Sequence, residues 1–351
     1  MQLLKTKLGY LLYLIGLIPL IVSCKGSSSS SSLTGNWKSA TPYGGDNRAY
    51  AVCFNLGDNE YLGLGRSNKT WYSDFWKYNI QTSSWDSVGV DPFKGVPRIK
   101  AIAFSINGKG YVGTGIDADG NYLKDFWEFD PTREKGKQWD SIAPFPGGKR
   151  AGCVGFSIGN LGYVGTGYDG GSDKGDFFVY NPDNDTWQTL TPGFQGEKRS
   201  DASVFIINDK AYIVGGWANG AALWDFYAFD PNASDAANTW TKLRDIKNTS
   251  SESYDDNYNI MRHDACAFTS TEGKGYFMLG VNSTIVGTVW EYDPANDLWD
   301  QKTSFEKAAK AGACAFTLGG RLFVATGTTG GSSYTYNMDE FEPNVEYNEN
   351  D

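Results

Sequence analysis

Histidine is almost missing from this sequence, which contains a single one, His263, among 351 residues. Metal centres that rely on several imidazole ligands are therefore not expected, and a Ser-His-Asp site would have to use this one side chain. Cysteine is also scarce, and no Cys-x-x-Cys pair occurs, which argues against a thiolate metal site. No glycine-rich phosphate loop leads from a predicted strand into a helix. We expect neither a metal nor a cofactor.

Positive charge is in deficit. The chain has 31 Lys and Arg against 41 Asp and Glu, a formal net charge of −10 and a pI of about 4.8. The basic footprint of a nucleic-acid-binding protein is absent, so nucleic acid is not expected as a partner. Long apolar runs are missing too, apart from residues 8–22, which follow Lys5 and Lys7 and are short for a membrane span. A basic start and a short apolar run indicate an export signal.

The apolar run ends at Ser23 and Cys24, and a serine tract occupies residues 27–32. Small residues before a cysteine and a serine tract after it resemble a bacterial lipoprotein signal. The resemblance implies a signal peptide over residues 1–23, a diacylglycerol-modified Cys24 and a Ser-rich tether over residues 24–34. It implies a lipid-anchored protein of the bacterial cell envelope, with the outer membrane as the expected location. An ordinary signal peptide with an incidental cysteine is the alternative.

The sequence is rich in a repeat built on aromatic residues and glycine. The motif Asp-Phe-Trp-x-Phe-Asp-Pro at residues 125–131 returns in modified form at residues 74–79, 176–182, 225–231, 290–294 and 340–343. A period near fifty residues is typical of propeller blades. Each repeat contains four short strand patterns with turn signals between them, such as Asn107 and Gly108. The sequence predicts an all-β, six-bladed propeller over residues 35–343, with four antiparallel strands per blade.

The closing tryptophans of the repeats indicate how the ring is joined. Five repeats end near one, namely Trp85, Trp139, Trp187, Trp240 and Trp299, whereas the sixth has none after Pro343. Trp37 lies 11 residues before Arg48, the spacing that separates Trp139 from Arg150. We therefore expect the strand near Trp37 to complete the last blade, which leaves no open blade at the seam. Residues 344–351 are expected to form a frayed acidic tail.

The repeats resemble the Kelch family. The shared features are a basic residue that opens the first strand, a Tyr-led second strand that ends in glycine, the Asp-Phe-Trp strand and the closing tryptophan. The double glycine of the family is kept at Gly215 and Gly216 and is replaced elsewhere by Gly-Thr-Gly or Leu-Gly. The resemblance implies the fold but selects no function, because propellers host binding proteins, scaffolds and enzymes.

Four further cysteines, Cys53, Cys153, Cys266 and Cys314, lie one to three residues before the repeat phenylalanines. Their recurrence among small residues favours buried free thiols. An even number in an exported protein also permits disulfides.

A set of basic residues opens the first strands of the repeats. In a propeller these strands line the central channel. The set consists of Arg48, Arg98, Arg150, Arg199, Arg262 and Lys310. We expect them to surround one channel mouth, where guanidinium groups could bind a carboxylate. Alternatively, each is structural and bonds loop carbonyls or repeat acids such as Asp74 and Asp125.

The loops expected on the same face carry aromatic residues, of which we select Trp71, Tyr122, Tyr168, Trp217 and Trp224. Aromatic faces around a polar mouth suit sugar rings or peptide side chains. They would equally serve to pack one loop on another. An insertion between Trp240 and Arg262 is expected either to overhang the mouth as a lid or to be a solvated excursion.

These features favour a binding module over an enzyme, with an anionic glycan or an acidic peptide of an envelope protein at the mouth. The alternative is an enzyme resembling bacterial sialic-acid mutarotases, which share this architecture. His263, Glu252 or Asp264 would then supply an acid and a base, and the arginines would hold the carboxylate of the sugar. A copper enzyme resembling galactose oxidase needs two histidines and is not expected. A purely structural envelope protein is the third interpretation.

Overall fold

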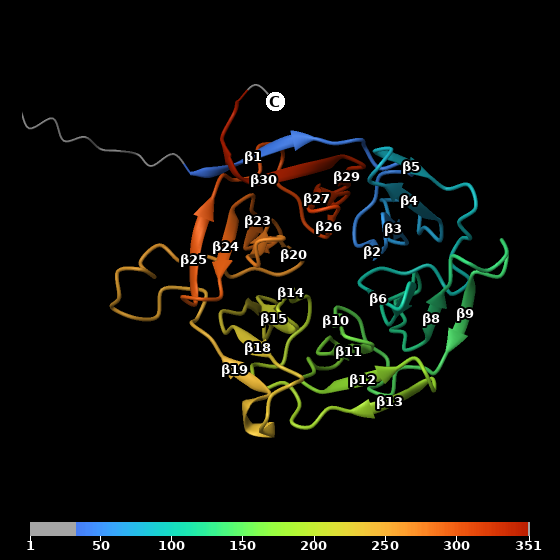
Figure 1. The fold of residues 1–351 in the computed structure, drawn as a ribbon, viewed down its shortest axis with the longest axis horizontal. Coiled ribbons are helices and arrows are strands. Elements are labelled where there is room, and N and C mark those ends of the chain that lie inside the picture. The colour runs from blue at the N-terminus through green and yellow to red at the C-terminus, as the bar shows by residue number, and fades with distance from the viewer. Residues whose placement is uncertain (1–32, 350–351) are drawn as a thin grey trace, which may run out of the picture. The chain divides into compact units, whose positions relative to one another are not determined.

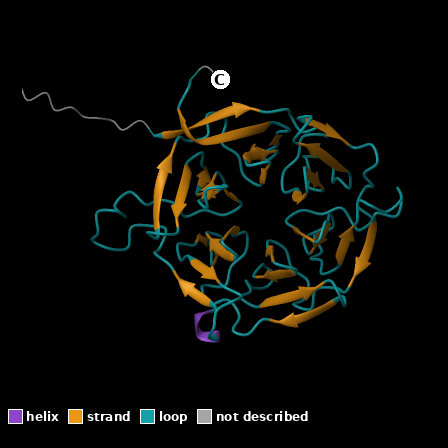
Figure 2. Ribbon diagram, viewed as in Figure 1, coloured by secondary structure: helices purple, strands orange, loops and turns teal. Residues whose placement is uncertain are grey.

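The computed structural model describes residues 33–349. The predicted signal peptide, Cys24 and most of the tether lie outside the described residues. Within residues 33–349 no helix has the length and apolar character that crossing a bilayer takes. This part of the chain contains a single 3₁₀ helix, η1 (Ala236–Asn238), and otherwise consists of strands and loops, as Figure 2 shows.

Six four-stranded antiparallel sheets surround a central axis within residues 33–349 (Figure 1). Blades one to three are β2 (Val52–Leu56), β3 (Asn59–Gly63), β4 (Phe75–Asn79) and β5 (Ser84–Asp86); β6 (Ile102–Ile106), β7 (Lys109–Gly113), β8 (Phe126–Phe129) and β9 (Trp139–Ile142); and β10 (Val154–Ile158), β11 (Leu161–Gly165), β12 (Phe177–Asn181) and β13 (Thr186–Thr189). Blades four to six are β14 (Ser203–Ile207), β15 (Lys210–Val214), β18 (Tyr227–Phe229) and β19 (Trp240–Lys242); β20 (Cys266–Thr269), β21 (Gly275–Met278), β24 (Val289–Asp293) and β25 (Leu298–Lys302); and β26 (Cys314–Leu318), β27 (Arg321–Ala325), β30 (Met338–Glu346) and β1 (Thr34–Ser39). The predicted all-β, six-bladed propeller is confirmed.

The last blade is closed by the first strand of the described chain. β1 lies beside β30, with Trp37 opposite Phe341. The Trp37 indole is 3% exposed and packs on Phe305 and Phe341, with ring centroids 4.8 and 4.7 Å apart. The expected closure by the strand near Trp37 is confirmed. β30 continues to Glu346, which pairs with Thr34, so the last strand extends beyond the boundary expected at residue 343.

The hydrophobic core lies between the blades. Each of six buried clusters within residues 33–349 joins two neighbouring blades through the aromatic residues of the repeat. Phe54 of blade one, for example, packs on Phe129 and Trp139 of blade two, at centroid distances of 5.9 and 6.5 Å. Blade two has Gly110 at the contact, because a Cβ atom there would lie 2.2 Å from the ring of Phe54. The repeat aromatics therefore hold adjacent blades together.

A ring of backbone hydrogen bonds also joins the six blades. In each blade the glycine after the second strand donates its N–H to the carbonyl of the basic residue in the next blade. The pairs are Gly65 with Arg98, Gly115 with Arg150, Gly167 with Arg199, Gly216 with Arg262, Gly280 with Lys310 and Gly327 with Arg48, at 2.7 to 3.1 Å. These glycines have φ between +80° and +113°, where residues with a Cβ atom are strained. The repeat glycine is thus required for contact between blades.

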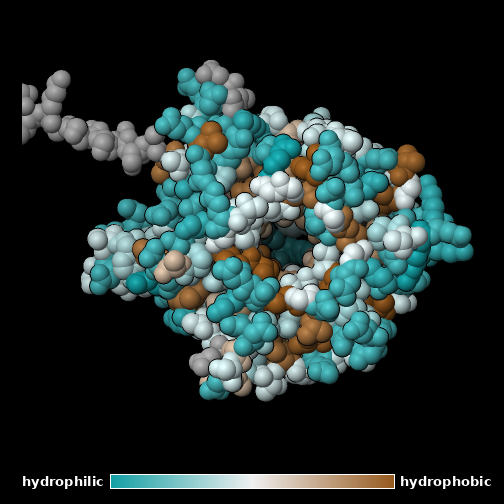
Figure 3. Space-filling model, in the orientation of Figure 1, coloured by the Kyte–Doolittle hydropathy of each residue, from teal (hydrophilic) through white to brown (hydrophobic). Residues whose placement is uncertain are grey.

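The first strands line the central channel with small side chains. A cavity of about 210 Å³ there is bordered by residues such as Cys53, Ala103 and Ala267, and the hollow at the centre of the ring is visible in Figure 3. All four cysteines of the described chain are free thiols, as the sequence favours. Burial raises the pKa of the Cys153 and Cys266 thiols to about 12, which suits inert apolar groups.

Candidate functional site

The basic residues of the first strands are buried, each no more than 1% exposed. Five of them bind an acid at the start of the third strand: Arg48 binds Asp74, Arg98 binds Asp125, Arg150 binds Asp176, Arg199 binds Asp225 and Lys310 binds Asp339. Arg98 donates to both carboxylate oxygens of Asp125 at 2.7 Å and to the Thr114 carbonyl at 3.0 Å. Arg262 bonds to carbonyls and a hydroxyl instead.

The expectation of an open ring of cations is therefore corrected. The planar guanidinium group matches a carboxylate, and each repeat but the fifth supplies that carboxylate itself. Once paired and buried, these side chains fasten the loops of one blade and do not face a ligand. The structural role, which the sequence left open as the alternative, is the one that the hydrogen bonds show.

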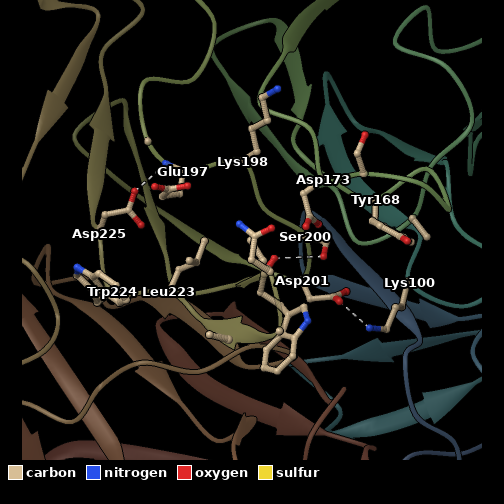
Figure 4. Close-up of a pocket in the computed structure, with 18 of the residues that line it drawn as sticks. Lys100, Tyr168, Asp173, Glu197, Lys198, Ser200, Asp201, Leu223, Trp224 and Asp225 are labelled. Carbon is tan, nitrogen blue, oxygen red and sulfur yellow. Dashed lines mark hydrogen bonds and ion pairs between the residues drawn. The ribbon is translucent and has the colours of Figure 1, made fainter.

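A pocket of about 1410 Å³ lies at the mouth, bounded mainly by loops of blades two, three and four. Four of the five selected aromatic residues line it, namely Tyr122, Tyr168, Trp217 and Trp224. Figure 4 shows Tyr168 and Trp224 on opposite sides of this space. Trp217 is carried by a hairpin of β16 (Trp217–Ala218) and β17 (Ala221–Ala222). Trp71 does not line the pocket, and its ring lies 5.6 Å from the Arg66 guanidinium.

Lys100 lines the pocket and reaches two acids from other blades. Its ammonium nitrogen is 2.7 Å from Asp201 Oδ2, a contact shown in Figure 4, and 3.0 Å from Asp264 Oδ1. The other oxygen of Asp264 lies 2.9 Å from Nδ1 of His263. The His263 ring packs on Trp217, with centroids 4.7 Å apart. This polar network joins blades two, four and five.

The position two residues after each basic residue forms a collar at the mouth. The collar consists of Tyr50, Lys100, Gly152, Asp201, Asp264 and Gly312, all with φ between +48° and +65°. Backbone N–H groups donate from Tyr50 to Gly312, from Gly312 to Asp264, from Asp264 to Asp201, from Asp201 to Gly152 and from Gly152 to Lys100, at 2.7 to 3.2 Å. A tyrosine and a lysine at positive φ are strained, and such strain clusters at functional positions. The collar and the pocket together form the candidate site.

The two collar carboxyls, Asp201 and Asp264, have pKa values that are shifted in opposite directions. Burial, and then repulsion from Asp264, raise the pKa of Asp201. Burial acts in the same direction on Asp264, but the hydrogen bond with His263 and the charge of Lys100 outweigh it and lower the pKa of that carboxyl. Burial opposes the charge of Lys100, yet the two acids raise its pKa. Asp201 is thus the better proton donor, and Asp264 is the group that stays ionised.

Asp201, His263 and Asp264 form the one group of potential metal ligands found in residues 33–349, with ligand atoms within 4.8 Å of one another. The Lys100 ammonium already lies against both carboxylates. This ammonium group already supplies the positive charge of the cluster, and a metal ion would have to displace it. The expected absence of a metal stays a prediction.

Sequence reasoning did not select Tyr50, Lys100 or Asp201. A signal was present, because the position two residues after the basic residue contains Tyr, Lys, Gly, Asp, Asp and Gly in the six repeats. Chemically varied residues at one position of a regular repeat indicate freedom from core packing. His263 and Asp264 were named as a potential acid and base, and the structure brings both into the network.

The insertion between β19 and β20 does not overhang the mouth. Figure 1 shows a long loop here that projects from the rim beside β25. Tyr258 packs into the cluster that contains Trp290 and Trp299, and its hydroxyl accepts a hydrogen bond from the backbone N–H of Trp299 at 2.7 Å. Glu252 is exposed on this insertion and takes no part in the collar network. The expectation of a lid is therefore corrected: its aromatic residues dock the loop on blade five.

Comparisons with known proteins agree with this architecture. A family model described as Kelch motif matches residues 198–246, which contain the four strands of blade four. No curated protein sequence matches the chain. Among solved structures the chain is similar to the structure of YjhT, with 16% sequence identity, a TM-score of 0.68, and coverage of 84% of this chain and 94% of that chain. At this identity the likeness concerns the fold alone. The chain is thus a six-bladed β-propeller that carries a Kelch motif.

Proposed function

We propose that this chain is a binding module of the bacterial cell envelope, anchored through lipid on Cys24, and that its ligand is a glycan held in the mouth pocket. The observation that carries the proposal is the pocket of about 1410 Å³, which four aromatic side chains share with Lys100 and Asp201 of the strained collar. Pockets for single small molecules measure roughly 300–1,000 Å³. This one has room for more than one sugar ring.

The lining combines aromatic faces with hydrogen-bonding groups, as sugars require. The apolar face of a sugar ring packs on an aromatic side chain, and its hydroxyls bond to polar groups at the edge. Trp217 supplies such a face on blade four. Trp224, which is 40% exposed, supplies the face that the Lys247 ammonium, 3.3 Å from the ring centre, does not cover. Asp173 lines the same pocket, and its Oδ1 atom is buried without a hydrogen-bond partner. The carboxyl would accept from a sugar hydroxyl once the side chain turns toward the pocket.

The charge of the side chains that line the pocket indicates the charge of its ligand. Lysines and acids nearly balance there: Lys100, Lys198 and Lys242 stand against Asp173, Glu197, Asp201 and Asp225. The anionic selectivity expected from the sequence rested on the buried arginines, which are already paired. The pocket therefore favours a glycan of low net charge over an acidic peptide.

The test is a glycan array on the full-length protein, followed by calorimetry with the best ligand. Trp217→Ala should lower the affinity at least tenfold, because buried tryptophans dominate binding energies. Trp71→Ala is the matched control, since Trp71 lies on a mouth loop outside the pocket, and its affinity should equal that of the wild type. An array without hits, or equal losses in both variants, would contradict the proposal.

A second candidate, a sugar mutarotase, is supported by the two collar carboxyls. Anomer exchange needs an acid that protonates the ring oxygen while a base removes the proton of the anomeric hydroxyl, and ring closure reverses both transfers. Asp201 would donate, and His263 with Asp264 would accept. Magnetisation exchange between the anomers of glucose or sialic acid measures this rate. No acceleration at high protein concentration removes this candidate, whereas acceleration lost in Asp201→Asn supports it.

A further inference from the structure

Blade five departs from a rule that the other blades obey. Elsewhere an acid near the start of the third strand binds the buried basic residue. Asp74, Asp125, Asp176 and Asp225 hold the same repeat position. Blade six has Asn337 at that position, and Asp339, two residues further along, binds Lys310 instead. Blade five has Thr288 at the first of these positions, directly before β24, and Trp290 at the second. The carboxylate that the repeat normally supplies is therefore missing there.

Arg262 is left as a buried cation with neutral partners. It is 1% exposed, and it donates to the carbonyls of Ile260, Leu279 and Thr288 and, at 2.8 Å, to the Thr288 hydroxyl. A longer contact of 3.5 Å joins it to the Asn259 carbonyl. Burial lowers the pKa of Arg262 to about 9, and no acid opposes it. Among the paired arginines, burial is outweighed by Asp74, which raises the pKa of Arg48, and burial lowers the pKa of Arg199 although Asp225 opposes it. A buried guanidinium group without an opposing charge is unfavourable, and an anion beside it would be stabilised.

A second donor in blade five also lacks its acceptor. In blade two the indole N–H of Trp127 donates to Asp125 at 2.7 Å, and blade one has the same contact. Trp290 holds the equivalent place, because it lies opposite Phe277 in the sheet as Trp127 lies opposite Val112. Trp290 is 4% exposed, and its indole nitrogen is buried without a hydrogen-bond partner. One missing carboxylate thus accounts for both the unpaired cation and the unpaired indole.

We propose that blade five binds an external carboxylate in the place of the missing aspartate, between Arg262, Thr288 and Trp290. One oxygen accepts from the guanidinium group and the other from the indole N–H, and the Thr288 hydroxyl rotates to donate. Thr288 is partly exposed, so the place can be reached from solvent. Exposure of the equivalent acids differs between blades, from 41% at Asp74 and 39% at Asp125 to 12% at Asp225. The site is independent of the glycan pocket, whose lining includes none of these three residues.

Thermal unfolding of the full-length protein at constant ionic strength tests this site, with acetate as the probe and chloride as the reference. Acetate should raise the Tm by about 1–2 °C at ten times its dissociation constant. Thr288→Asp supplies the carboxylate internally, so its Tm should exceed that of the wild type and should not respond to acetate. Thr284→Asp adds the same charge on a nearby exposed residue and should keep the acetate response.

A parallel series with glucuronate distinguishes the source of the carboxylate. A larger shift than with acetate assigns the site to a sugar acid, and an equal shift assigns it to any small carboxylate; both support the site. The proposal is overturned by a wild-type Tm that acetate and chloride change alike. It is equally overturned if Thr288→Asp responds to acetate as the wild type does, or if its Tm lies below that of Thr284→Asp.

Discussion

At the scale of single residues, this propeller neutralises five of its six buried first-strand cations locally, each with an acid of its own repeat. Arg98 has no exposed surface, and Asp125, which caps it, is 39% exposed. The two partners are therefore not equivalent. Removal of the acid leaves a charge inside the protein, whereas an exposed pair loses little when it is broken.

Asp125→Asn should lower the free energy of unfolding by about 2–4 kcal/mol, somewhat less than for a fully buried pair because the acid is partly solvated. Urea denaturation followed by tryptophan fluorescence measures it. Lys137→Ala is the control, because Lys137 and Glu134 form a pair that is 73% and 81% exposed. That variant should change the free energy by less than about 0.5 kcal/mol. Similar losses in both variants would contradict the local neutralisation.

The sequence locates the residues of the site better than it orients them. It placed Tyr122, Tyr168, Trp217 and Trp224 at the mouth, because loop position follows from the repeat. It showed where Arg98 lies along the chain but not that its side chain turns into the blade. Lys100 escaped notice because its role depends on a left-handed backbone and on acids that lie more than a hundred residues away.

At the scale of elements, the seam between β1 and β30 is where the ring depends on pairing between segments at opposite ends of the described chain. Trp37 is the side chain that anchors β1, through Phe305 and Phe341. The closure was predictable, because the count of closing tryptophans demands a sixth. The continuation of β30 to Glu346 was not, because exposed residues there show no strand alternation.

Trp37→Ala should lower the free energy of unfolding by about 3–5 kcal/mol, since it removes a large buried ring and leaves a cavity at the seam. Urea denaturation again gives the value. Val88→Ala, at a side chain that is 76% exposed, is the reference and should change the free energy by less than about 0.5 kcal/mol. Equal free energies of unfolding in the two variants would show that β1 does not stabilise the seam.

The insertion before β20 is a second element whose position the sequence did not predict. Its length and its acids indicated a long surface loop, but a sequence does not reveal in which direction a loop leaves a sheet. The direction of this loop is set by the packing of Tyr258 on Trp290, a contact that the strand pattern did not predict.

At the scale of the whole molecule, buried phenol and thiol groups set the alkaline limit of stability. Burial, and then the charge of Asp264, raise the pKa of Tyr50 to about 12. The folded state therefore holds this proton more tightly than the unfolded state does. The stability that it contributes is complete below the ordinary tyrosine pKa of about 10 and is lost as the pH rises through about 12. The Cys153 and Cys266 thiols, also raised to about 12, act in the same direction from about pH 9 upward.

The free energy of unfolding should consequently fall between about pH 9 and pH 12, and Tyr50 should account for a loss of about 2–3 kcal/mol. Urea denaturation at successive pH values measures this slope. Tyr50→Phe should flatten it, whereas Tyr347→Phe, at a ring that is 50% exposed, should not. An unchanged slope in Tyr50→Phe would show that another group dominates.

The hydrogen-bonded ring of glycines and basic residues has a topological consequence. It is a closed circuit with no first member, since Gly327 donates to Arg48 just as Gly65 donates to Arg98. The two ends of the described chain lie side by side in one blade. If they were linked, the backbone could be cut in the outer loop of any other blade, and the same circuit would form. The molecule is therefore equivalent to a circle, and circular permutation would leave the order of its blades unchanged.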